Sequence, residues 1–121
     1  MSRILVIEDS PAIALLLRRR LVMAGHEVEI SATGAAALER LAPARLPDLG
    51  LSDVMMPGPD GIETAGRIKG FFPDLPVILV TGQELTSEST GDADAVFGKP
   101  IDFDRLLETV DRLSGSRPEN A

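Results

Sequence analysis

The sequence predicts an α/β domain in which a parallel sheet is covered by helices on both faces. Short apolar runs of strand length alternate along the chain with longer stretches whose apolar residues recur at helical spacing. The first run, residues 4–7, is continuously apolar, which is typical of a central parallel strand that is buried on both faces. With 121 residues, the chain has room for one domain of this kind and not for two.

Each expected strand is followed by a turn or a helix. The first strand leads into Ser10 and Pro11, which predict an N-cap followed by proline at the first helical position. The helix keeps its apolar spacing up to Gly25, which is a typical stop signal. Further strands are expected at 26–31, 48–53, 77–80 and 95–97, and further helices at 34–42, 62–69 and 102–113.

The segment between the fourth and fifth strands departs from this alternation. Residues 83–91 are polar and poor in helix formers, so we expect the fourth helix to be short or missing. The C-terminal residues are polar too and contain Gly and Pro. We therefore divide the chain into a folded domain at 1–114 and a flexible tail at 115–121.

Composition argues against several classes of function. The absence of cysteine excludes thiol catalysis, Cys-based zinc sites and disulfides. Nineteen acidic against twelve basic residues give a net charge of −7, which is unfavourable for binding the phosphate backbone of a nucleic acid. No apolar stretch approaches the ~20 residues that span a bilayer, and the N-terminus lacks the features of a signal peptide. We expect a cytoplasmic protein that binds neither nucleic acid nor a membrane.

Polar side chains collect at the carboxyl ends of the predicted strands, where open parallel sheets bind their ligands. Glu8 and Asp9 follow the first strand, and Asp53 ends the third. Thr81 follows the fourth strand, and Lys99 follows the fifth, directly before a proline. Three carboxylates at close range are unfavourable without a cation, so the cluster predicts a hard divalent ion such as Mg²⁺. A metal ion beside a lysine suits phosphoryl transfer, in which positioning and charge neutralisation supply most of the catalysis.

This order of residues closely resembles the receiver domain of two-component response regulators. Residues 4–10 are similar to the first strand and acidic pair of that family, and residues 53–61 to its phosphoacceptor loop. The resemblance covers roughly residues 3–113. It implies a flavodoxin-like fold, with five parallel strands in the order 2-1-3-4-5 and helices on both faces.

The resemblance also implies a metal site. Asp9 would bind Mg²⁺ directly, Glu8 would act through a water molecule, and Asp53 and the backbone carbonyl of Met55 would complete the protein ligands.

A phosphoryl-transfer role is implied for three residues. Asp53 would take a phosphoryl group from a sensor histidine kinase or a histidine phosphotransfer protein. Thr81 would donate a hydrogen bond to a phosphoryl oxygen, and Lys99 would pair first with Asp53 and then with the phosphoryl group. The modified domain would switch a surface that binds a downstream protein, as a monomer or weak dimer. On this interpretation the chain is not an enzyme with a separate substrate, because it catalyses only its own phosphorylation and dephosphorylation.

Two alternative functions stay open. A pseudo-receiver that serves only as a binding scaffold is disfavoured because Asp53, Thr81 and Lys99 are all present. An aspartyl-nucleophile phosphatase is disfavoured because its Asp-x-Asp pattern is absent after the first strand and the chain has no room for a cap. Because no helix-turn-helix follows residue 113, we expect a stand-alone receiver and not a transcription factor.

Two further residues are interpreted as structural. Gly61 is expected to shape the loop and the entry into the helix that follows it. His26, the only histidine, follows a glycine in a turn and is expected at the surface, without a part in phosphotransfer.

Overall fold

The computed structural model describes residues 2–54, 61–82, 93–98 and 100–115. Five parallel strands form one sheet in the order β2-β1-β3-β4-β5, as predicted. The strands are β1 (Arg3–Ile7), β2 (Glu27–Ser31), β3 (Leu49–Asp53), β4 (Val77–Thr81) and β5 (Ala95–Gly98). The helices are α1 (Pro11–Met23), α2 (Gly34–Arg40), α3 (Gly61–Phe71) and α5 (Phe103–Gly115).

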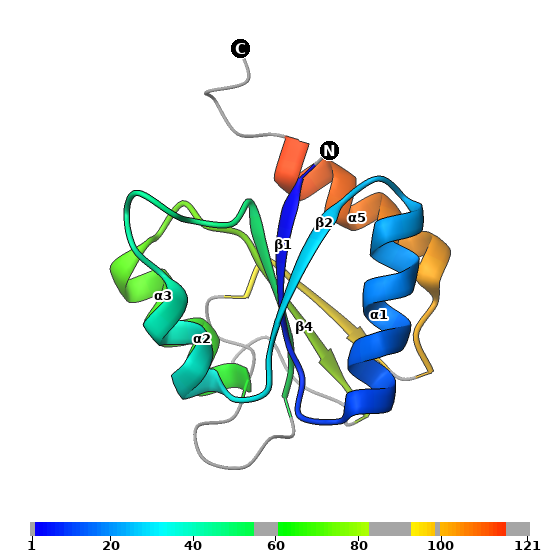
Figure 1. Ribbon diagram of the computed structural model, residues 1–121, viewed down its shortest axis with the longest axis horizontal. Coiled ribbons are helices and arrows are strands. Elements are labelled where there is room, and N and C mark those ends of the chain that lie inside the picture. The colour runs from blue at the N-terminus through cyan, green and yellow to red at the C-terminus, as the bar shows by residue number, and fades with distance from the viewer. Residues whose placement is uncertain (1, 55–60, 83–92, 99, 116–121) are drawn as a thin grey trace.

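The helices cover the sheet in two pairs, α1 with α5 and α2 with α3 (Figure 1). Side chains of successive strand residues point to opposite faces, so the continuous apolar run of β1 supplies both layers of the core, as expected. The layer under α1 and α5 contains Ile4, Val6, Leu17, Leu21, Leu49, Leu51, Ile78, Val80, Leu106 and Val110. The layer under α2 and α3 contains Leu5, Ile7, Ala37, Val54, Ala65, Ile68, Leu75, Val77 and Leu79.

Helix α1 begins and ends at the predicted signals. The Oγ of Ser10 accepts a hydrogen bond from the N–H of Ile13 at 3.5 Å, and Pro11 is the first helical residue. Gly25 has a φ of 95°, a left-handed conformation that favours glycine, and it turns the chain toward β2. This helix leaves the carboxyl end of β1 and returns the chain to the amino end of β2.

The element boundaries agree with the expected ones to within two residues, and α5 extends to Gly115. The expectation of a short or missing fourth helix falls on residues 83–92, which lie outside the described part of the chain. The same holds for residues 116–121 of the predicted tail. Among the described residues, no helix is both long enough and apolar enough to cross a membrane.

His26 corrects a prediction, because its side chain is buried and not at the surface. Its Nδ1 accepts a hydrogen bond from the N–H of Ser2 at 3.2 Å, and its Nε2 lies 3.0 Å from Oδ1 of Asp111 in α5. The turn before β2 is therefore in contact with α5. The neighbouring sequence carries no sign of this contact, since Asp111 is 85 residues away.

Candidate functional site

Three carboxylates meet where β1 and β3 end. These strands are neighbours, and Ile7 of β1 is in register with Ser52 of β3. Glu8 and Asp9 leave the end of β1 next to Asp53, the last residue of β3. One carboxylate oxygen from each lies within 4.8 Å of the other two. Glu8 and Asp53 are buried, whereas Asp9 is exposed at the mouth of the cluster.

Glu8 is held in place by the loop between β1 and α1. Its backbone N–H donates to the carbonyl of Ser31 at 3.0 Å, and its Oε2 accepts from the N–H of Ser10 at 3.0 Å. The pKa of Glu8 is raised to about 7, mainly by burial and also by the charge of Asp53, while the hydrogen bond from the Ser10 N–H acts in the opposite direction. Glu8 therefore holds its proton more tightly than an exposed carboxyl group does, and a cation placed beside it would favour the ionised form.

Asp53 stands on a backbone that is fixed on two sides. The N–H of Val54 donates to the carbonyl of Val80 in β4 at 3.0 Å, and the N–H of Gly61 donates to the carbonyl of Val54 at 3.0 Å. A Cβ on Gly61 would lie 2.8 Å from the carbonyl carbon of Asp53 and 2.8 Å from Cα of Val54. Glycine is therefore required at this position, because the start of α3 rests directly on the strand end that carries Asp53. The predicted structural role of Gly61 agrees with this contact.

Thr81 is the last residue of β4 and is almost fully buried. Asp53 is in register with Val80, so Thr81 is one residue further along the adjacent strand, at the same edge of the sheet. The structure thus places four of the six predicted site residues at this edge: Glu8, Asp9, Asp53 and Thr81. The other two, Met55 and Lys99, lie outside the described residues.

The donor set fits a hard divalent cation. Carboxylate oxygens are the ligands that Mg²⁺ prefers, and it commonly takes one or two of them while keeping several waters. The exposed position of Asp9 leaves the cluster open on one side, where water or a phosphoryl oxygen can enter. Glu8, Asp9 and Asp53 are therefore the residues that would hold the metal.

Comparison with known proteins gives a consistent result. The chain matches the family model of the response regulator receiver domain over residues 4–111. It is 36% identical to response regulator MprA of Mycobacterium tuberculosis, over 98% of this chain and 54% of that protein. It thus spans about half the length of the curated relatives it matches.

Two solved structures are similar along nearly the whole chain. Response regulator protein TrrA of Thermotoga maritima, in complex with Mg²⁺ and BeF, is 36% identical with a TM-score of 0.86, covering 93% of this chain and 99% of that one. The signal receiver domain of a signal transduction histidine kinase from Syntrophus aciditrophicus is 34% identical with a TM-score of 0.87, covering 98% and 94%.

Proposed function

The chain belongs to the response regulator receiver domain family of two-component systems, and from this premise we propose that it accepts a phosphoryl group on Asp53 in a Mg²⁺-dependent reaction. The observation that carries the proposal is the meeting of Glu8, Asp9 and Asp53 within 4.8 Å at the ends of two adjacent strands. The Mg²⁺ and BeF bound to the Thermotoga relative support the choice of metal. We also propose that the receiver unit corresponds to residues 1–114, with α5 continuing one residue further, to Gly115.

Asp53 acts as the nucleophile. Its carboxylate oxygen forms a bond to the phosphorus of a phosphohistidine on the donor protein, and the bond from phosphorus to the imidazole nitrogen breaks. The donor is a histidine kinase or a histidine phosphotransfer protein. The metal, when bound, neutralises charge on the phosphoryl oxygens and on the attacking carboxylate.

Residues around Asp53 position the phosphoryl group. Glu8 and Asp9 supply the metal ligands beside it, together with the backbone carbonyl of Met55. Thr81 donates its hydroxyl hydrogen to a phosphoryl oxygen, and Lys99 contributes a positive charge there.

The result of the reaction is a signal. Receiver domains are generally signalling domains and not enzymes with separate substrates. We propose that phosphorylation of Asp53 changes a surface that binds a downstream protein, and that the isolated chain is a monomer or weak dimer. The rival function, a scaffold that is never phosphorylated, has the same fold and differs only in the chemistry at Asp53.

The test is the intact mass of the protein after incubation with acetyl phosphate and Mg²⁺. We expect one phosphoryl group to be added, and none in the presence of EDTA or in Asp53→Asn. Asp9→Ala should require far more Mg²⁺ for the same modification, because it loses a metal ligand. Absence of any mass increase would favour the scaffold, and an increase that survives Asp53→Asn would place the acceptor elsewhere.

A further inference from the structure

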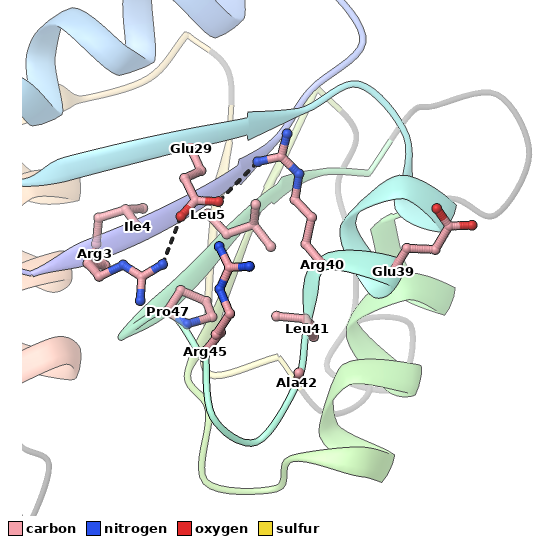
Figure 2. Close-up of a pocket in the computed structure, with 10 residues that line it drawn as sticks. All are labelled: Arg3, Ile4, Leu5, Glu29, Glu39, Arg40, Leu41, Ala42, Arg45 and Pro47. Carbon is pink, nitrogen blue, oxygen red and sulfur yellow. Dashed lines mark hydrogen bonds and ion pairs between the residues drawn. The ribbon is translucent and has the colours of Figure 1, made fainter.

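A cavity of about 480 Å³ lies over β1 and β2 (Figure 2), and it is separate from the acidic cluster of Glu8, Asp9 and Asp53. It begins at Arg3, the first residue of β1, whereas Glu8 and Asp9 follow the opposite end of that strand. The cavity exists because α2 is short. The helix ends at Arg40, and the chain up to Pro47 runs along the rim without covering the strands beneath it.

Three guanidinium groups surround one carboxylate in this cavity (Figure 2). Glu29 of β2 accepts from Arg3 at 2.8 Å through Oε1 and from Arg40 at 3.0 Å through Oε2. The hydrogen bond from Arg3 is the main cause that lowers the pKa of Glu29, so this carboxylate is ionised. The carboxylate of Glu39 points away from the arginines (Figure 2).

The side chain of Arg45 differs from those of the other two arginines, because it takes no part in the ion pairs that connect the elements. Arg3, Glu29 and Arg40 tie β1, β2 and α2 together, which gives two of the arginines a structural role. The Arg45 guanidinium reaches toward the same carboxylate (Figure 2) but forms no ion pair within residues 2–54, 61–82, 93–98 and 100–115. Three arginines and two glutamates line the cavity, so its lining is net positive in a chain whose net charge is −7.

Beneath the arginines the lining is apolar. Leu5 is in register with Glu29 on the adjacent strand, so both side chains leave the sheet on the same face. Leu5 and Pro47 are buried, and Leu41 is half-buried beside them. A charged rim over an apolar floor, with a volume of several hundred Å³, is typical of sites for small organic molecules.

We propose that this cavity binds a small organic anion, with one carboxylate or phosphate-type group attached to an apolar body. The charged group lies between Arg40 and Arg45, because the planar guanidinium matches such oxygens in two-point contacts. The apolar body covers Leu5 and Pro47. This site is independent of phosphorylation at Asp53.

Calorimetric titration of the full chain tests the proposal, in buffer freed of divalent metal by a chelating resin so that no metal recruits anions to the acidic cluster. The probes are benzoate, phenylphosphonate and the neutral benzyl alcohol. We expect saturable binding of at least one of the two anions at one site per chain, and none of the alcohol. The tighter of the two anions identifies the ligand class as carboxylate or phosphate. Failure of both anions, or equal binding of the alcohol, would overturn the proposal.

Two substitutions with opposite expected effects locate the site. Arg45→Gln should weaken binding of the anion by about tenfold or more, the effect of losing one hydrogen bond to a charged group. Glu29→Gln should tighten it, because the substitution removes the carboxylate that competes for Arg3 and Arg40. Arg18→Gln is the control, since Arg18 is an exposed arginine of α1 on the other face of the sheet. Unchanged binding in Arg45→Gln, weaker binding in Glu29→Gln, or an equal loss in the control would each contradict the site.

Discussion

At Glu8, burial of the carboxyl group opposes the ionised form that a metal ligand requires. Its carboxyl group is buried beside Asp53, and its pKa is raised from 4.5 to about 7, mainly by burial. In the unfolded chain the same group titrates near its ordinary value. The folded protein therefore binds a proton at Glu8 over a pH range in which the unfolded chain has released it. Across that range the free energy of unfolding must depend on pH.

We expect the metal-free protein to lose stability as the pH rises from 4.5 to about 7, because the folded state binds more protons in this window. The full effect is on the order of 3 kcal/mol above pH 7, and it is absent below pH 4.5. Urea unfolding in EDTA at several pH values measures it. Glu8→Gln, which stays neutral, should be less sensitive to pH and more stable than the parent at pH 8. Parallel stability curves for the two proteins would contradict the assignment.

Binding of Mg²⁺ should show the opposite dependence on pH. The metal needs ionised carboxylates, and protons compete with it for Glu8 below about pH 7. The affinity should therefore rise as the pH increases from 6 to 8, by several-fold, as measured by calorimetric titration. Glu8→Gln removes this competition and should flatten the dependence while retaining binding through Asp9 and Asp53. A pH dependence that persists in the variant would assign it to another group.

Among the elements, α3 determines the position of the strand end that carries Asp53, the proposed phosphoacceptor. Gly61→Ala should destabilise the protein by about 1–3 kcal/mol, because the new methyl group would overlap the backbone of Asp53 and Val54. Phosphorylation by acetyl phosphate should also slow, since Asp53 must shift. Urea unfolding and the rate of mass increase measure the two effects.

Gly66 offers a matched control within the same helix. A Cβ at Gly66 meets nothing within 4 Å, so Gly66→Ala should stabilise α3 by roughly 0.5–1 kcal/mol and leave phosphorylation unchanged. Equal effects of the two substitutions would mean that helix propensity, and not contact with the strand end, governs both positions.

The elements also show why some features could be predicted from the sequence and others could not. The limits of α1 depend on local signals, the Ser10 cap and the turn at Gly25, and both were predicted correctly. The meeting of Glu8, Asp9 and Asp53 followed from one rule, that parallel strands end at the same edge of a sheet. The contact of Gly61 with Asp53 depends on how closely α3 approaches β3, which no pattern in the sequence specifies.

On the scale of the whole molecule, the two ends of the sheet differ in the residues that they carry. The carboxyl ends of the strands carry the acidic cluster. Near the opposite end, hydrogen bonds join the start of the chain to its last helix, which Figure 1 shows side by side. The hydroxyl of Ser2 donates to that of Ser114, which donates to the carbonyl of Val110. His26 lies at the same junction, bound to Ser2 on one side and to Asp111 on the other. We interpret this junction as structural and independent of phosphorylation.

His26→Ala should lower the free energy of unfolding by about 1–3 kcal/mol, because the partly buried N–H of Ser2 loses its acceptor and the space of the buried imidazole is left empty. Amide exchange should accelerate in the last turns of α5, while phosphorylation of Asp53 keeps its rate.

Asp111→Asn is the discriminating control. The Nδ1 of His26 accepts from Ser2, so Nε2 is the ring nitrogen that can donate to Asp111, and the amide oxygen of Asn can accept the same hydrogen bond. This variant should therefore lose less than about 1 kcal/mol, and a loss as large as that of His26→Ala would mean that the contact with Asp111, and not the one with Ser2, accounts for the effect. Slower phosphorylation in His26→Ala would mean that the junction is coupled to the acidic cluster across the length of the sheet.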